Sequence, residues 1–356
     1  MRCLFVSSFF LALSGIAAAT GSVAIVQGSD TIVGVDGETL VTNSFAEQPS
    51  AIVKLTTFNN TVYAATYQIL GSTLGSISAF DVLFDDLGFG PSEDYDSCND
   101  PTDITATFDA PSPSYVIMTC TNTTLVVDPV TLELVQAVPT PTIDDIQIVR
   151  AVSAAAAGDY LFIAYQTKLV RGERFVSKGL LVQYDINSFS ILGSKRIIGT
   201  TIYLVASTKR GLLLTSSGFG RSFFRQMELA NLRTMITMRS DDETFRDMSI
   251  TPDEKSLYIS YEGSDGNTGG IRSIDLTASP AEQLCRDSPI QGSPVGASTV
   301  MDGSLYVASG GRITRYELNQ GNRCPLTGTV TSVGESELTT NAITSMCTEC
   351  DPPMSR

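Results

Sequence analysis

Carboxylates are the side chains of this chain best suited to chemistry, because histidine is absent from all 356 residues. Catalysis by Ser-His-Asp or Cys-His arrangements, zinc binding through imidazole and proton transfer by histidine are therefore excluded. Oxygen ligands remain, and a Ca²⁺ ion takes about six to eight of them. The chemistry open to the chain is metal binding by carboxylates, or hydrolysis assisted by a metal bound in that way.

Two groups of acidic residues could bind such an ion. The first is a dense run between residues 82 and 103 that contains Asp85, Asp86, Glu93, Asp94, Asp96, Asn99, Asp100 and Asp103. This run lacks the glycine and the terminal glutamate of an EF-hand loop, so a solvated acidic insertion is the alternative. The second group is dispersed along the chain and consists of Asp103, Asp144, Asp145, Asp247 and Glu262. It forms a Ca²⁺ site only if the fold brings these residues together, and ordinary loop acids are the alternative.

A repeat in the sequence indicates which elements would position these carboxylates. At intervals of 42 to 57 residues, a short apolar run ends on an acidic residue: Asp36, Asp81, Asp128, Asp185, Glu228, Asp275 and Glu317. A β-rich stretch and a polar or Gly-rich turn precede most of these acids, so each unit contains a hairpin. Four short strands repeated about every 40 to 50 residues are typical of a β-propeller. We predict an all-β fold, a seven-bladed propeller with four-stranded blades, over residues 20–346.

The innermost strand of each blade is expected just before its hairpin. Six candidates lie at residues 51–56, 103–108, 146–152, 202–206, 246–250 and 295–300. The first hairpin has no room for a preceding strand, so we predict that residues 341–346 supply it and close the ring. Inner strands line the channel of a propeller, so the dispersed acids are expected at its mouth. The seven repeated acids end strands at the opposite face, where they are expected to accept hydrogen bonds from turn amides.

Two of the seven repeats resemble the YVTN-type repeat of surface-layer and lactonase-like propellers. Residues 251–260 read Thr-Pro-Asp-Glu-Lys-Ser-Leu-Tyr-Ile-Ser, and residues 302–309 read Asp-Gly-Ser-Leu-Tyr-Val-Ala-Ser. Tryptophan is absent, so the Trp-containing signatures of WD and kelch repeats are excluded. The resemblance implies a propeller fold. Calcium-dependent lactonases of this fold hold their metal with Asp, Glu and Asn at the channel, which makes a hydrolase an alternative function.

The first 19 residues are predicted to be a secretory signal peptide. Arg2 precedes an apolar run over residues 4–19 that ends in three alanines, which suits cleavage before Thr20. No later segment is long and apolar enough to cross a bilayer. We therefore expect a secreted, extracellular protein without a transmembrane segment.

Cysteines and glycosylation sequons fit export. Removal of the signal leaves six cysteines, an even number that an oxidising compartment would pair: Cys98, Cys120, Cys285, Cys324, Cys347 and Cys350. We predict the pairs 98–120 and 285–324, and a close pair in the tail of residues 347–356. The C-x-x-C spacing of that last pair lacks a βαβ context, which favours a structural disulfide over a redox site. Asn59 and Asn122 begin sequons at expected turns and are predicted glycosylation sites.

Charge is distributed unevenly along the chain. Residues 20–149 hold one basic residue, Lys54, against 17 acidic ones, whereas residues 150–356 hold 21 of each. Such an acidic sector disfavours nucleic acid and favours Ca²⁺ or a basic partner, while solubility of an exported protein is the alternative. The densest basic run, Lys168 to Lys178, lies in a second expected insertion at residues 166–179.

The sequence favours a binding module over an enzyme. We expect a secreted propeller that binds an extracellular protein or glycan partner through the two insertions, which should share one face. An exposed apolar patch is expected there, around Tyr67, Phe89 and Phe219. A Ca²⁺-dependent hydrolase such as a lactonase is one alternative, and a structural component of an envelope or matrix is another. Ca²⁺ is the one cofactor considered.

Overall fold

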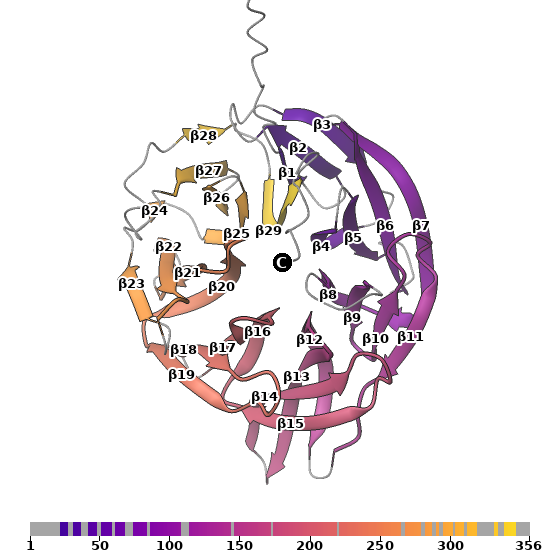
Figure 1. Ribbon diagram of the computed structural model, residues 1–356, viewed down its shortest axis with the longest axis vertical. Coiled ribbons are helices and arrows are strands. Elements are labelled where there is room, and N and C mark those ends of the chain that lie inside the picture. The colour runs from indigo at the N-terminus through magenta and orange to yellow at the C-terminus, as the bar shows by residue number, and fades with distance from the viewer. Residues whose placement is uncertain are drawn as a thin grey trace, which may run out of the picture.

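The computed structural model shows a chain built of β-strands arranged about a common centre (Figure 1). It describes residues 22–27, 31–36, 42–47, 51–58, 61–67, 74–83, 86–107, 114–143, 146–171, 174–218, 221–264, 268–278, 282–286, 290–291, 295–301, 303–309, 312–318, 331–333 and 338–346. These ranges contain strands, turns and bends. Within them, no helix is long and apolar enough to span a membrane.

Antiparallel pairing organises the described strands into seven sheets. The first contains β29 (Leu338–Met346), β1 (Ser22–Gln27), β2 (Thr31–Asp36) and β3 (Thr42–Glu47) in that order. The second contains β4 (Ala51–Phe58), β5 (Thr61–Tyr67), β6 (Leu74–Leu83) and β7 (Asp86–Asn99). The third contains β8 (Pro101–Ala106), β9 (Val116–Cys120), β10 (Thr123–Val127) and β11 (Leu134–Pro139).

The other four sheets follow the same plan. The fourth contains β12 (Gln147–Ala157), β13 (Tyr160–Arg171), β14 (Arg174–Asp185) and β15 (Ile191–Ile197). The fifth contains β16 (Thr200–Ser207), β17 (Gly211–Gly218), β18 (Arg221–Met227) and β19 (Thr234–Ser240). The sixth contains β20 (Glu243–Ile250), β21 (Ser256–Gly263), β22 (Thr268–Asp275) and β23 (Glu282–Arg286), with β24 (Ile290–Gln291) also on β22. The seventh contains β25 (Val295–Met301), β26 (Ser304–Ser309), β27 (Arg312–Glu317) and β28 (Thr331–Val333).

The inner strands, β29, β4, β8, β12, β16, β20 and β25, are neighbours of one another. Contacts join β29 to β4, β4 to β8, β8 to β12 and β12 to β16, and then β16 to β20, β20 to β25 and β25 to β29. Figure 1 shows them facing the centre of the molecule. All six expected inner strands are present. Residues 341–346 lie in β29, which pairs with β1 from Ser22↔Met346 to Ile25↔Ile343.

Burial changes across each sheet in the way that this radial arrangement requires. All five residues of β9 and all five of β10 are buried, so both faces of these middle strands are covered by neighbouring sheets. The outer strand β11 has one buried residue, Val138, among six. Apolar runs therefore form the middle strands and mixed sequences form the outer ones.

The prediction of two loop insertions is wrong. Residues 86–99 form β7, the outer strand of the second sheet, which pairs with β6. On it Tyr95 and Cys98 are buried while Glu93, Asp94 and Asp96 are exposed, the apolar-in, polar-out pattern of a sheet with one solvated face. Residues 166–179 continue the β13–β14 hairpin up to the pair Arg171↔Arg174. Charge density suggested loops, but an outer strand can carry consecutive exposed residues, and of residues 91–99 only Tyr95 and Cys98 are buried.

The predicted disulfide between Cys98 and Cys120 is present, with Cα atoms 5.4 Å apart. It joins β7 of the second sheet to β9 of the third, and both cysteines are buried. A Cβ on Gly75 would lie 2.4 Å from Cys98 Sγ, so only glycine fits beneath the bridge. The disulfide therefore links two sheets at their packed interface.

We predict that replacing both cysteines, Cys98→Ala with Cys120→Ala, lowers the free energy of unfolding by about 3 kcal/mol, since the bridge closes a loop of moderate length. Urea titration of the variant and the wild type under non-reducing conditions measures this change. A loss below about 0.5 kcal/mol, the scatter of neutral surface changes, would contradict it.

Candidate functional site

A β-bulge recurs in six inner strands, immediately before one residue of each. The register with the neighbouring strand shifts before Lys54, Asp103, Ser153, Tyr203, Asp247 and Ser298. Bulges redirect the side chain that follows them and are common beside functional sites. We call these six residues the central polar cluster, because equivalent positions on inner strands carry all of them.

Lys54 is the cation of the central polar cluster. Its Nζ lies 2.8 Å from Asp103 Oδ1, and its side chain is 27% exposed. The same Nζ lies 4.9 Å from the centre of the Tyr203 ring, which belongs to an inner strand three sheets away. Burial disfavours the charged amine, but the carboxylates of Asp103 and Asp247 outweigh it and raise the pKa of Lys54 above its usual range. The ammonium therefore stays charged.

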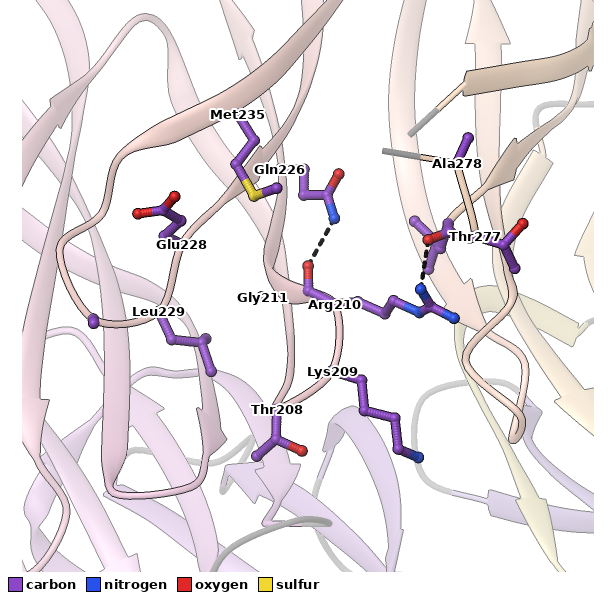
Figure 2. Close-up of a pocket in the computed structure, with 12 residues that line it drawn as sticks. Thr208, Lys209, Arg210, Gly211, Gln226, Glu228, Leu229, Met235, Thr277 and Ala278 are labelled. Atoms are coloured by element: carbon purple, nitrogen blue, oxygen red, sulfur yellow. Dashed lines mark hydrogen bonds between the residues drawn. The ribbon is translucent and has the colours of Figure 1, made fainter. Parts of the chain in front are cut away.

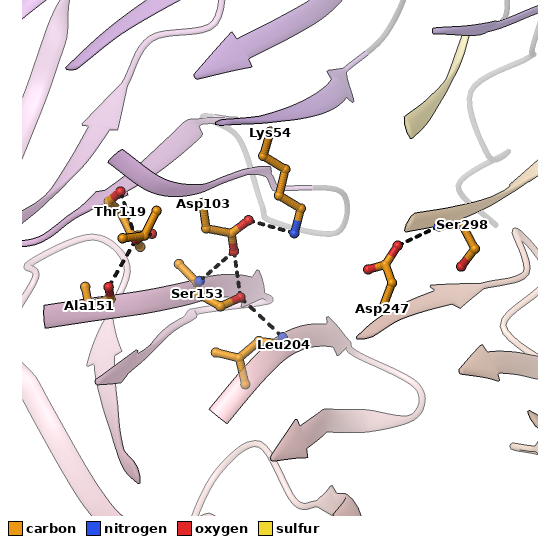
Figure 3. Close-up of polar contacts among 10 residues, drawn as sticks. Lys54, Asp103, Thr119, Ala151, Ser153, Leu204, Asp247 and Ser298 are labelled. Carbon is orange, nitrogen blue, oxygen red and sulfur yellow. Dashed lines mark hydrogen bonds and ion pairs between the residues drawn. The ribbon is translucent and has the colours of Figure 1, made fainter. Parts of the chain in front are cut away.

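Asp103 joins three neighbouring inner strands (Figure 3). Its Oδ2 accepts hydrogen bonds from Ser153 Oγ at 2.6 Å and from Ala154 N at 3.3 Å, both on β12. Ser153 Oγ in turn accepts a hydrogen bond from Leu204 N of β16 at 3.3 Å. With Lys54 on its Oδ1, Asp103 has partners for both carboxylate oxygens.

Asp247 forms the corresponding link on the other side of the centre. Its Oδ2 accepts a hydrogen bond from Ser298 N of β25 at 2.8 Å, and Ser249 Oγ donates to Ser298 O at 2.7 Å. Burial raises the pKa of Asp247 to about 6, although Lys54 and the backbone N–H groups act in the opposite direction. Figure 3 shows the Lys54 side chain between the two aspartates.

The predicted metal ligands are only partly brought together. Asp103 and Asp247 face the same ammonium, whereas Glu262 on β21 accepts a hydrogen bond from Arg246 Nε at 2.8 Å. Asp144 and Asp145 lie outside the described residues. In the described part of the chain, no three Asp, Glu, Cys or His side chains cluster closely enough to hold a metal ion. Among these residues a lysine ammonium balances the central carboxylates, and the Ca²⁺ site stays a prediction.

The remaining sequence-predicted sites are mostly outside the described part. Among them are Asn59, Cys324, Cys347 and Cys350, and for Cys285 only the backbone of β23 is described. Asn122 is exposed between β9 and β10, and its Nδ2 donates to Ser97 O at 3.1 Å. Its glycosylation stays a prediction.

Asp128, Asp185 and Asp275 have the structural role that the sequence predicts, because each accepts a hydrogen bond from a backbone N–H of the turn. Glu228 does not, since its carboxylate accepts hydrogen bonds from side chains. Asp128 Oδ1 accepts from Val130 N and Thr131 N, both at 2.8 Å, and Asp185 Oδ1 accepts from Ser188 N at 2.7 Å. These backbone hydrogen bonds lower the pKa of both aspartates. Four residues after each acid, Leu132 and Phe189 adopt positive φ angles of 58° and 53°. The acid thus fixes the turn that leads into the outer strand.

Exposed apolar side chains follow these turns, a feature that the sequence analysis did not recognise. We define the apolar rim as Val130, Leu134 and Val135 at β11, Ile191 and Leu192 on β15, and Met235 on β19. Their exposed fractions are 81%, 44%, 46%, 54%, 52% and 42%. Apart from Val130, they stand six or seven residues after Asp128, Asp185 and Glu228. That recurring spacing was the signal in the sequence.

The apolar rim lies at the opposite end of the sheets from the patch expected around Tyr67. Tyr67 ends β5 and is 38% exposed, while Phe219 and the Phe89 side chain lie outside the described residues. The three sheets of the rim are consecutive, because β8, β12 and β16 are neighbours. Lys195 Nζ of β15 also donates to Leu232 O at 2.6 Å and so holds β15 against the turn before β19.

Comparison with solved structures identifies the fold as a β-propeller. A protein of unknown function from Desulfotomaculum acetoxidans superposes with a TM-score of 0.61 at 10% identity, over 93% of this chain and 100% of that one. The C-terminal WD40 domain of Sif2 superposes with a TM-score of 0.54 at 13% identity, over 91% of this chain and 82% of that one. The Neurospora crassa Pan2 WD40 domain superposes with a TM-score of 0.52 at 9% identity, over 76% of each chain. Identities this low show the fold alone.

No family model matches this chain, and no curated protein does. The class that fold and comparisons define is therefore the β-propeller, and the more specific resemblance to YVTN-type repeats stays a prediction.

We predict that Lys54→Met lowers the free energy of unfolding by about 3 kcal/mol, because it leaves Asp103 with a buried, unpaired charge. Adding Asp103→Asn should restore part of the loss. Lys255→Met is the matched control, since Lys255 is 64% exposed and pairs with Asp253 at the surface. Urea titrations of the four proteins measure the effect, and equal midpoints for Lys54→Met and Lys255→Met would disprove it.

Asp247 should give the protein a pH dependence opposite to that of an ordinary salt-bridged acid. Its folded pKa of about 6 exceeds the usual aspartate value, so the folded state binds this proton more tightly than the unfolded state. The contribution of Asp247 to the free energy of unfolding is full below about pH 4. It falls by up to about 3 kcal/mol as the pH rises through about 6.

We therefore predict that Asp247→Asn flattens the fall of the unfolding midpoint between about pH 4.5 and 7. Asp185→Asn is the control, because the pKa of Asp185 is lowered and its contribution disappears only at more acidic pH. Parallel profiles for wild type and Asp247→Asn would show that this carboxyl does not carry the effect.

Proposed function

We propose that this protein is a secreted, seven-bladed β-propeller that binds another protein through the apolar rim. The seven described sheets are its blades, and the pairing of β29 with β1 closes the ring. The signal-like N-terminus, Arg2 followed by an apolar run, supports export. The partner is then an extracellular protein.

The apolar rim is the observation on which this proposal rests. Single exposed apolar residues are ordinary on protein surfaces, but clustered ones mark interaction sites. Here they recur at equivalent positions of three consecutive sheets, so the repeat aligns them at one end of the ring. All six side chains lack hydrogen-bonding groups apart from the weak acceptor sulfur of Met235. A surface of this kind suits the apolar core of a protein interface better than a glycan.

A metal-dependent hydrolase has less support from the described residues. Asp103 is bonded to Lys54, Ser153 and Ala154, and Glu262 is paired with Arg246. These carboxylates bind neighbouring strands and cations of the protein itself. The central polar cluster therefore has the character of a structural network, and recognition is assigned to the outside of the ring.

The test replaces Ile191 and Leu192 together by asparagine. Both side chains are about half exposed, so the free energy of unfolding should change by less than about 0.5 kcal/mol each. We expect at least about tenfold weaker binding to the partner, because rim side chains would lie in the core of the interface. Affinity capture from the native extracellular fraction identifies the partner, and titration with the purified partner measures the affinity.

Ile198→Asn is the matched control. Ile198 directly follows the same strand, β15, at its other end, and it is 60% exposed. Its replacement should leave binding unchanged. If both variants bind the partner as tightly as the wild type, the rim is not the interface. If both variants lose affinity for the partner to the same extent, the loss is not specific to the rim, and the proposal is contradicted as well.

A further inference from the structure

A pocket of about 400 Å³ opens beside the apolar rim, between the fifth and sixth sheets (Figure 2). It is lined by the β16–β17 turn at residues 208–211, by the end of β18 and the turn after it, and by residues 276–278 after β22. Met235 belongs to both the rim and the pocket. A cavity of this size can hold a side chain and part of a backbone.

Apolar residues line the pocket from both sheets. Leu229, Ala230 and Met235 come from the fifth sheet, and Leu276 and Ala278 follow β22 of the sixth. Figure 2 shows Met235 and Leu229 on the side opposite Ala278, and Met235 is 42% exposed. Gln183 Nε2 donates to Leu229 O at 2.8 Å, which fixes the turn that carries Leu229 to the neighbouring sheet. This part of the lining is therefore formed before any ligand arrives, and an aliphatic side chain fits it by burial of apolar area.

The β16–β17 turn brings cations into the pocket between these apolar residues. Figure 2 shows the side chains of Lys209 and Arg210 extending from the same turn. Arg210 donates from Nε to Glu254 O at 2.7 Å and from Nη1 to Leu276 O at 2.8 Å, so its orientation is fixed. Its Nη2 makes no hydrogen bond within the described residues, and Lys209 is 70% exposed with Glu254 at 3.5 Å.

The charged residues that line the pocket differ in net sign from the chain. Two cations, Lys209 and Arg210, line it with one carboxylate, Glu228. Behind this lining, Glu254 is paired with Lys209 and Asp275 accepts a hydrogen bond from Thr277. The whole chain carries a net charge of −15. A carboxylate ligand is therefore attracted to this place although most of the sequence disfavours it.

A buried glutamine supports the turn that carries the cations. Gln226 lines the pocket and is 5% exposed, and its Nε2 donates to Arg210 O at 2.8 Å. Its Oε1 is buried and accepts no hydrogen bond from the described residues.

We propose that this pocket binds an aliphatic side chain of the partner protein together with the carboxylate that follows it, as in a Leu-Asp or Leu-Glu sequence. The inference rests on the proposed protein-binding function and names the chemistry of the partner. The aliphatic group contacts Met235 and Leu229, and the carboxylate lies against Lys209 and Arg210.

Three short blocked peptides test it on the mature protein: acetyl-Gly-Leu-Asp-Gly-amide, its Leu-Asn analogue and its Ser-Asp analogue. The methyl resonance of Met235, assigned through Met235→Leu, reports binding. We expect the Leu-Asp peptide to shift this resonance to saturation, the Leu-Asn peptide to bind at least about fivefold more weakly, and the Ser-Asp peptide to leave it unmoved.

Lys209→Gln should reduce the preference for Asp over Asn at least about twofold, because Arg210 remains, while Lys255→Gln, another exposed lysine paired with a carboxylate, should retain it. Equal affinities for the Asp and Asn peptides in the wild type, or no shift of Met235 with any peptide, would overturn the inference. If the Ile191 and Leu192 variant loses its partner while no peptide moves Met235, the pocket fails and the protein-binding function stands. If the peptides bind but no partner depends on the rim, the proposed function fails instead.

Discussion

Burial of both faces of the middle strands is the constraint on which the rest of this structure depends. Strands such as β9 and β10 bury every side chain, so a single sheet would expose half of its apolar residues to water. Each sheet therefore requires two neighbours, and a chain of such sheets has no unfavourable end only if its last member meets its first. The position of β29 between β1, β4 and β25 follows from this requirement. The Cys98–Cys120 bridge strengthens one of the interfaces so formed.

The same packing brings polar side chains of the inner strands close together, and they must then satisfy one another. Asp103 and Asp247 accept hydrogen bonds from the neighbouring inner strands, and Lys54 offsets their charge. A buried carboxylate without such partners would be costly. The bulges before these residues turn the polar side chains toward each other and leave apolar residues between the sheets. The centre is thus a network that specifies how the strands meet, and the surface is left for recognition.

The sequence was sufficient for the strands but not for the site. Inner strands, hairpins and the role of Asp128 and Asp185 could be predicted, because alternation and the repeated acid are local signals. The contact of Lys54 with Tyr203 could not be predicted, since it joins residues from strands three sheets apart and depends on how the sheets are arranged about their common centre. The acidic run at β7 was taken for a loop because its charge was weighed above the buried Tyr95 and Cys98 between the acids.

A departure from the repeat marks the position of the pocket. In the third and fourth sheets an aspartate holds the turn through backbone N–H groups, and an aliphatic pair opens the outer strand. In the fifth sheet the acid is Glu228, whose carboxylate binds Asn231 and Arg233 side chains instead, and Thr234 takes the place of the first aliphatic residue. Thr234 Oγ1 accepts a hydrogen bond from Lys195. The aliphatic pair is not general, since β23 of the sixth sheet opens with Glu282 and Gln283. Beside Met235 the turn is held by side-chain bonds that leave the cations of the β16–β17 turn next to an exposed apolar residue, which is the chemistry that the proposed ligand requires.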